Sequence, residues 1–235
     1  MDISAQSRQS DMKLTKFGHS CVRLDSTDHR TVIDPGGFTD VITAAAGAET
    51  IFITHEHPDH VDDELVVQLL AGHYSVRLYA PETVIERLSH RVATEKRDIS
   101  EHRLKVIAAG DELDLPGFHV QAVGGQHEII HPQIPQIDNI GYVLNGSVYH
   151  PGDSFIVPAG VEIDTLCLPI NAPWASLEDT LDFMISVRPR QAVPIHDGLL
   201  SDNGHTIYDK QVQAFAERYG IELNLLAEGE HAWTR

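Results

Sequence analysis

The chain has 235 residues, of which 42% are hydrophobic, and this is enough apolar material for the core of one domain rather than two. Its formal net charge of −18 would repel nucleic-acid phosphates and anionic lipid surfaces, which argues against a nuclease. No apolar run reaches the roughly 18–20 residues that a membrane span needs, so no transmembrane helix is expected.

Residues 1–11 are expected to form a loose tail, and residues 12–235 a single domain. The tail is polar and lacks the apolar segment of a secretory signal. The two cysteines, Cys21 and Cys167, do not form a C-x-x-C pair, and each lies in an apolar, strand-like run. This pattern favours buried, reduced thiols and a cytoplasmic location.

The first half of the chain is predicted to start with strands and to continue with strands and helices in turn. Apolar or alternating runs, separated by turn residues, predict strands at 13–17, 21–25, 30–34, 51–54 and 76–80. A helix is predicted at 62–70, where acidic residues occupy the first turn, and another at 81–89, which opens with proline.

The second half repeats this theme. Strands are predicted at 104–108, 118–123, 140–144, 147–150, 164–169, 191–195 and, closing the chain, 221–226. Asn145-Gly146 predicts a tight hairpin, and helices are predicted at 177–187 and at 206–219, before Gly220. Many strands with helices in both halves favour an α+β sandwich of two facing sheets with helices outside over a doubly wound parallel sheet.

The segment His55-Glu56-His57-Pro58-Asp59-His60 follows an apolar strand. Alternate residues of a strand point to the same face, so His55 and His57 can converge on one metal ion. Pro58 ends the strand and leaves Asp59 and His60 at the turn into the next helix. Imidazole and carboxylate groups suit Zn²⁺, Mn²⁺ or Fe²⁺. Alone, Asp59 could be a helix N-cap and His55 a core histidine, but the combined pattern favours a metal site.

This pattern, Thr-His-x-His-x-Asp-His, resembles the signature of the metallo-β-lactamase superfamily. Further motifs of that family occur in the same order: Val-Ile-Asp-Pro-Gly with Asp34, Gly-Gly-Gln-His with His127, Gly-Asp-Ser with Asp153, and Val-Pro-Ile-His with His196. The resemblance spans Lys13 to the C-terminus. The opening segment, residues 13–20, is similar to the branch that contains ascorbate-phosphate lactonase and N-acyl-phosphatidylethanolamine phospholipase D.

The resemblance implies a four-layer αβ/βα sandwich, the metallo-β-lactamase fold, and two divalent metal ions, with Zn²⁺ the first choice and Mn²⁺ or Fe²⁺ as alternatives. One ion would be held by His55, His57 and His127, and the other by Asp59, His60 and His196. Asp153 would bridge them, and Asp59 and Asp153 would be the catalytic carboxylates. The pair of ions can activate a bridging hydroxide that cleaves a small ester-type bond, such as a lactone, phosphodiester or thioester.

Three further residues are candidates for substrate binding, each with a structural alternative. His19 follows Gly18 at a strand end and could line the pocket or make a turn contact. His131, in the loop 128–139, could reach over the site or belong to an irregular surface loop. Trp174 could form a pocket wall or pack in the core. His150, near Asp153, is interpreted as a strand-end residue in preference to a support of the metal site.

Three other functions stay open at this point. A metal-dependent nuclease of the same fold would need a basic track or an added domain, and neither is evident in this acidic chain. A non-catalytic metal-binding protein would usually have lost ligands, whereas this chain keeps seven. A mono-iron dioxygenase would use fewer of them. We expect a small-molecule substrate and no nucleic-acid partner, and a homo-oligomer is compatible with the sequence.

Overall fold

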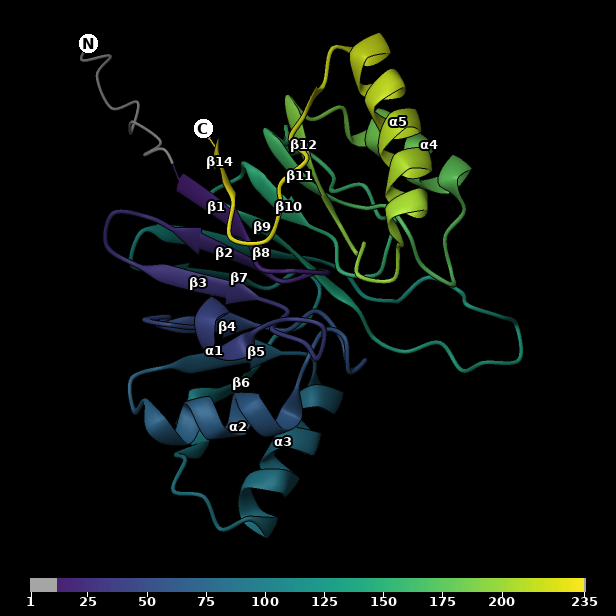
Figure 1. The fold of residues 1–235 in the computed structure, drawn as a ribbon. Helices are drawn as coiled ribbons and strands as arrows, with labels where there is room; N and C mark the ends of the chain where they lie inside the picture. Colours follow the sequence, from purple (N-terminus) through teal and green to yellow (C-terminus); the bar gives the residue numbers. More distant parts are fainter. Residues whose placement is uncertain (1–11, 235) are drawn as a thin grey trace, which may run out of the picture.

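The computed structural model describes residues 12–234, so the tail expected at residues 1–11 lies outside the described residues. Over residues 12–234 the chain forms two mixed, seven-stranded sheets, and helices cover their outer faces (Figure 1). This arrangement confirms the predicted four-layer αβ/βα sandwich. Within the same residues, no helix combines the length and apolar character required to cross a membrane.

The first sheet has the strand order β14-β1-β2-β3-β4-β5-β6. Its strands are antiparallel from β14 to β3 and parallel from β3 to β6. The strands are β1 (Met12–Lys16), β2 (Val22–Asp25), β3 (Arg30–Ile33), β4 (Thr50–Phe52), β5 (Arg77–Ala80), β6 (Leu104–Val106) and β14 (His231–Thr234). The helices of this half are α1 (Val41–Ala44), α2 (Asp63–Gly72), α3 (Glu82–Thr94) and the 3₁₀ turn η1 (Glu101–Arg103).

The second sheet has the order β13-β12-β11-β10-β9-β8-β7 and combines parallel and antiparallel pairing in the same way. Its strands are parallel from β13 to β10 and antiparallel from β10 to β7. They are β7 (Glu112–Leu115), β8 (Phe118–Gly124), β9 (Ile140–Leu144), β10 (Val148–His150), β11 (Thr165–Pro169), β12 (Gln191–Ile195) and β13 (Glu222–Leu223). Helices α4 (Leu177–Val187) and α5 (Asp202–Tyr219) pack on its outer face (Figure 1).

Apolar side chains fill the three spaces between the four layers. The central cluster, between the sheets, includes Leu14, Phe52 and Tyr142. A second cluster joins the first sheet to α2 and α3, and a third joins the second sheet to α4 and α5. Strands β11 and β12 are buried along their whole length, as expected for parallel strands covered on both faces. These packed strands give the loops at their ends a rigid base.

The structure corrects several predicted elements. The closing strand predicted at 221–226 is only the two-residue β13, and the last strand is β14, which pairs with β1. In β14 only Ala232 and Thr234 are buried, a signal too short to recognise in sequence. Strand β4 ends at Phe52 rather than at Thr54. Helix α1 and strand β7 were not predicted, whereas the Asn145-Gly146 turn does connect β9 to β10, with positive φ at both residues.

Candidate metal centre

All seven side chains predicted to bind metal lie together, in loops that follow the C-terminal ends of strands. The loop between β4 and α2 supplies four of them, and the loops after β8, β10 and β12 supply one each. Within the described residues these seven and His19 form two groups, and inside each group the ligand atoms lie within 4.8 Å of one another. One group is His55, His57, His127 and Asp153, and the other is His19, Asp59, His60 and His196.

The first group has the spacing of a tetrahedral metal site. His55 Nε2 lies 3.0 Å from His57 Nδ1, and His127 Nε2 lies 3.3 Å from Asp153 Oδ2. His55 Nε2 is 3.7 Å from the same carboxylate oxygen. Ligand atoms at ~2.0–2.2 Å from a tetrahedral Zn²⁺ would be roughly 3.3–3.6 Å apart, so these atoms could surround one ion after small adjustments.

The second group shares the carboxylate of Asp153 with the first. Asp153 Oδ1 lies 3.0 Å from His60 Nε2, and Asp153 Oδ2 lies 3.2 Å from His196 Nε2. Asp59 Oδ2 lies 3.7 Å from His196 Nε2 and 3.9 Å from His60 Nε2. Asp153 therefore faces both groups, which is the position of a carboxylate that could bridge two cations.

Hydrogen bonds on the far side of the rings leave the Nε2 lone pairs of three histidines free for a metal ion. The Nδ1–H groups of His60 and His196 donate to Asp34 Oδ2 (2.7 Å) and to the Asn171 carbonyl (2.6 Å). His127 Nδ1–H donates to the Glu128 carbonyl (2.6 Å). The three Nε2 atoms, and Asp153 Oδ1, are buried without a hydrogen-bond partner in the described chain. Buried polar atoms rarely stay unsatisfied, and a bound cation would satisfy all four.

Thr54 fixes the tautomer of His55 in a similar way. Its hydroxyl donates to Asp34 Oδ2 (2.7 Å), so it can only accept from His55 Nδ1–H at 3.0 Å. The Nε2 lone pair of His55 then faces Nδ1 of His57, and a cation between them would relieve this contact. The donor set, its tautomers and its spacing all fit a metal ion.

His19 lies in the second group, but its hydrogen bonds make it a donor rather than a ligand. The backbone N–H of Gly198 donates to His19 Nδ1 (3.1 Å), so the ring proton lies on Nε2. His19 Nε2–H therefore donates to Asp59 Oδ2 at 3.0 Å. The ring is buried and does not line the cavity described below. In this structure His19 orients Asp59 and contacts the turn at Gly198.

The buried charges depend on one another. Burial opposes the protonation of His60, but the carboxylates of Asp153 and Asp34 raise its pKa well above the ordinary value. Burial favours the neutral acid at Asp153, yet the surrounding histidines, His60 first, hold the pKa of that carboxyl well below its usual range. Burial also works against the charge on Asp59, and the hydrogen bond from His19 lowers its pKa to about 2. The buried carboxylates of the two groups are therefore stabilised by positive charge close to them.

Three of the six non-glycine residues with positive φ in the described chain belong to the site. His19, Asp34 and His196 adopt positive φ angles of 42°, 52° and 58°. Such angles are uncommon for residues other than glycine and cost about 1–3 kcal/mol each in sparsely populated regions. The surrounding contacts hold these turns: the backbone N–H of His196 donates to the His19 carbonyl (3.0 Å).

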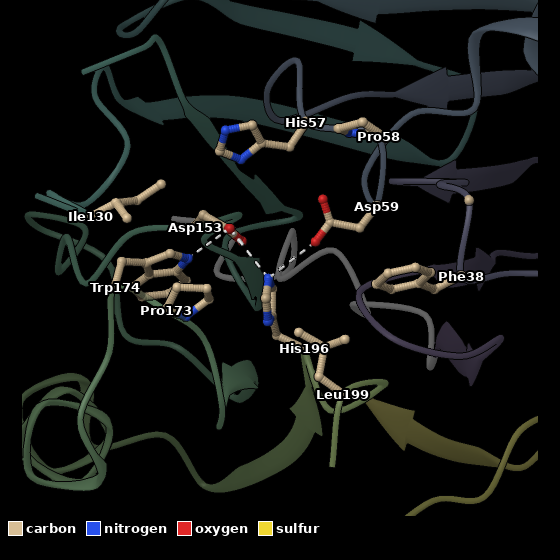
Figure 2. A pocket seen from close by; sticks show the side chains of 11 residues that line it. Phe38, His57, Pro58, Asp59, Ile130, Asp153, Pro173, Trp174, His196 and Leu199 are labelled. Carbon is tan, nitrogen blue, oxygen red and sulfur yellow. Dashed lines mark hydrogen bonds and ion pairs between the residues drawn. The ribbon is translucent and has the colours of Figure 1, made fainter. Parts of the chain in front are cut away.

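A cavity of about 350 Å³ opens beside the two groups (Figure 2). His57, Asp59, Asp153 and His196 form its base. Its walls are Gly37, Phe38, Pro58, Ile130, Pro173, Trp174 and Leu199. Its volume is within the ~300–1,000 Å³ of small-molecule sites.

Of the predicted substrate-binding residues, only Trp174 lines this cavity. Its indole N–H donates to Asp153 Oδ2 (2.9 Å), a contact that the sequence did not suggest. His131 is exposed, and its Nδ1 accepts from the Gln133 backbone, so the loop between β8 and β9 presents Ile130 to the cavity in its place.

Sequence reasoning missed several residues that support the site. Asn139 is buried, and its side-chain oxygen accepts from the backbone N–H of Asp153 (2.9 Å). Thr54 was recognised only as part of the motif. His150 ends β10 as predicted, and it also supports the site, because its Nδ1 accepts from the backbone N–H of Gly152 beside Asp153. Its Nε2 donates to the Ser20 carbonyl, so no lone pair is left for a metal.

Two facing sheets with this histidine and carboxylate cluster at the strand ends define a metal-dependent hydrolase of the metallo-β-lactamase fold. The sequence model of the Beta-lactamase superfamily domain matches residues 13–196. A UPF0173 metal-dependent hydrolase of Methylobacterium nodulans is 43% identical over 213 residues, which cover 80% of this chain and 85% of that protein. The chain belongs to the UPF0173 family of metal-dependent hydrolases within this superfamily.

Two further similarities agree with this assignment. Protein Rv0786c of Mycobacterium tuberculosis is 36% identical over 202 residues, covering 84% of this chain and 89% of that protein. The structure of Igni18, a metallo hydrolase from the archaeon Ignicoccus hospitalis, superposes with a TM-score of 0.69 at 18% identity. The match covers 95% of this chain and 98% of Igni18, and at this identity it shows the fold alone.

Proposed function

We propose that this metal-dependent hydrolase binds two divalent metal ions, with Zn²⁺ the first choice, and cleaves a small ester-type bond. The observation that carries the proposal is the buried Asp153 carboxylate, which faces the unpartnered Nε2 atoms of His60, His127 and His196. Two cations held close together need a shared anionic ligand, and this carboxylate is placed to supply it. His55, His57 and His127 would hold one ion, and Asp59, His60 and His196 the other.

When bound, such a pair of ions supplies an activated water and polarises the oxygen of the scissile bond. The chain's own residues orient the reactants. Asp59 can accept a hydrogen bond from the attacking water, and its oxygen is held in place by His19 Nε2 at 3.0 Å. Trp174 fixes Asp153 from the cavity side. Because Asp59 has a pKa of about 2, it stays an acceptor at neutral pH.

The proposal extends to a branch of the superfamily, a compartment and a substrate size. The segment 13–20 supports placement near the ascorbate-phosphate lactonase and N-acyl-phosphatidylethanolamine phospholipase D branch. The two cysteines are free and buried, which suits a reducing compartment such as the cytoplasm. The substrate is proposed to be a small molecule, because the site opens into a cavity of limited volume.

Metal content per chain tests the dinuclear proposal. The protein, purified anaerobically and reconstituted with Zn²⁺ or Mn²⁺, should bind two equivalents. Asp153→Ala and His196→Ala should each reduce this to about one and abolish metal-dependent hydrolysis of an activated ester. His205→Ala, at a half-buried histidine on α5 that belongs to neither metal-binding group, is the matched control and should retain both ions. Unchanged stoichiometry in the two site variants would refute the proposal, and a single Fe per wild-type chain would favour a mono-iron dioxygenase.

A further inference from the structure

Apolar side chains stand on both sides of the metal-binding groups. Figure 2 shows Phe38 and Leu199 on one side of Asp59 and His196, and Ile130, Pro173 and Trp174 on the other. These residues come from four loops, after β3, β8, β11 and β12. Phe38 and Leu199 are 52% and 58% exposed, so both present apolar surface at the mouth of the cavity. Such apolar surface commonly marks a binding site.

The cavity also lacks positive side chains. None of the described residues that line it is lysine or arginine. The nearby Lys16 is buried and paired with Asp197. Arg87 and Arg91 line a separate depression beyond Pro58, where Arg87 pairs with Asp63 at 2.8 Å and Arg91 with Glu95 at 2.7 Å. A phosphate or carboxylate on the part of the substrate that lies against the apolar walls would therefore meet no lysine or arginine side chain.

From the apolar walls and the lack of lysine and arginine among the lining residues we infer the substrate class: an uncharged carboxylic ester or lactone that carries an apolar acyl chain. The inference rests on the proposed function, because the reacting bond must lie at the metal-binding groups between the two walls. Water adds to the carbonyl carbon, the acyl–oxygen bond breaks, and the products are a carboxylic acid and an alcohol, joined in one molecule for a lactone.

Rigid walls favour this assignment further. The Trp174 ring is fixed by its bond to Asp153 and by edge contacts with the rings of Phe155 and His196, at centroid distances of 5.1 and 5.7 Å. A preformed apolar wall binds an alkyl chain without the entropic cost of ordering the wall. Covering each additional methylene group should then strengthen binding and, if the contact persists in the transition state, increase kcat/KM.

The test uses the metal-loaded protein and a series of p-nitrophenyl esters: acetate, butyrate and octanoate, with bis(p-nitrophenyl) phosphate as the charged comparison. We expect kcat/KM to rise by about threefold for each added methylene group that the walls cover. Leu199→Ser should lower the octanoate-to-acetate ratio of kcat/KM by about tenfold. Ile207→Ser, an equally exposed apolar residue on α5 outside the cavity, should leave the ratio unchanged.

The outcomes separate this inference from the proposed function. If two metal ions bind and acetate is hydrolysed without any chain-length preference, or the phosphodiester is preferred, only the inference fails. If no ester is turned over, the binding of neutral ketones tests whether the cavity prefers an apolar chain. In a Trp233→Phe background, Trp174 fluorescence should report tighter binding of 2-decanone than of 2-butanone, and Leu199→Ser should remove the difference. Equal binding of the two ketones would overturn the inference.

Discussion

At the scale of single residues, the metal centre depends on which ring nitrogen of each histidine carries the proton. Asp34, which is fully buried, sets the tautomers of two of these histidines. Its Oδ2 accepts from His60 Nδ1–H and from the Thr54 hydroxyl, and its Oδ1 accepts from the Thr54 backbone N–H at 2.7 Å. Through Thr54 it also sets the tautomer of His55. Asp34 is therefore a positioning residue that acts on ligands of both groups.

Replacing Asp34 with asparagine should weaken metal binding without changing the side-chain volume. In either orientation the new amide places an NH₂ group against a donor, either His60 Nδ1–H or the Thr54 N–H. With the NH₂ group against His60, the proton of that ring would be favoured on Nε2, where it blocks the metal. With the NH₂ group against the Thr54 N–H, the backbone that leads into His55 would be displaced. We expect a 10- to 100-fold weaker metal affinity, measured by competition with a chromophoric chelator.

Asp40→Asn is the matched control for this measurement. Asp40 also accepts bonds from a threonine side chain and backbone, at 2.6 and 3.1 Å from Thr43, but it caps the exposed helix α1. Its substitution should leave the metal affinity unchanged. An Asp34→Asn protein with wild-type affinity would show that the tautomers are not set in this way.

At the scale of elements, two loops must fit closely to place the metal-binding segment. The loop after β3 packs on the loop between β4 and α2, where the Gly37 N–H donates to the Pro58 carbonyl at 2.7 Å. A Cβ atom added at Gly36 would lie 1.9 Å from the Asp59 carbonyl oxygen, so only glycine fits there. The position of Asp59 and His60 thus depends on Gly36, which is not a metal ligand.

Gly36→Ala should therefore displace the metal-binding loop. We expect the free energy of unfolding to fall by about 1–3 kcal/mol, the usual cost of overpacking, and the metal content to drop below two per chain. Gly72→Ala on α2 is the control: no atom lies within 4 Å of its added Cβ, and the change should be neutral or slightly stabilising. Denaturant titration and metal analysis measure both effects. Equal stability of the two variants would contradict the tight fit.

The elements and ligands were predictable from sequence to different degrees. The ligand residues carry chemistry that is visible in the sequence, and the apolar strands before them gave their approximate places. The reason given for pairing His55 with His57, strand alternation, was wrong, because β4 ends at Phe52 and a loop brings the rings together. The partners of the ligands were beyond prediction. Backbone carbonyls such as that of Asn171 have no sequence signature, and the His19 tautomer depends on Gly198, 179 residues away.

At the scale of the whole molecule, the candidate metal centre joins the two halves of the sandwich. The loop after β4 of the first sheet supplies His55 to His60, and the second sheet supplies the other three ligands. A metal ion that binds only the folded state stabilises it by mass action, by about 2.7 kcal/mol at a free concentration 100 times its dissociation constant. Metal binding should therefore oppose separation of the sheets.

The two cysteines can report this effect, because each is fully buried in a different core. Cys21 lies in the cluster between the first sheet and its helices, and Cys167 in the cluster between the sheets. Burial raises the pKa of Cys167 to about 12, and that of Cys21 is raised as well. An unfolded thiol ionises near pH 8.5, whereas the buried thiols stay neutral above that pH. The contribution of the two thiols to the free energy of unfolding should therefore be fully present below about pH 8.5 and decline as the pH rises above it.

In the metal-loaded protein at pH 8, neither thiol should react with an aromatic disulfide reagent until the molecule opens. Removing the metal with a chelator should accelerate the labelling of both thiols by about a hundredfold for each bound ion, where the free metal was 100 times its dissociation constant. The single variants Cys21→Ala and Cys167→Ala assign each rate, and Asp153→Ala should show a much smaller response to the chelator. If only Cys167 accelerated, the metal would hold the sheets together without stabilising the first sheet against its helices. If neither thiol responded, the metal centre would make no contribution to the stability of the sandwich.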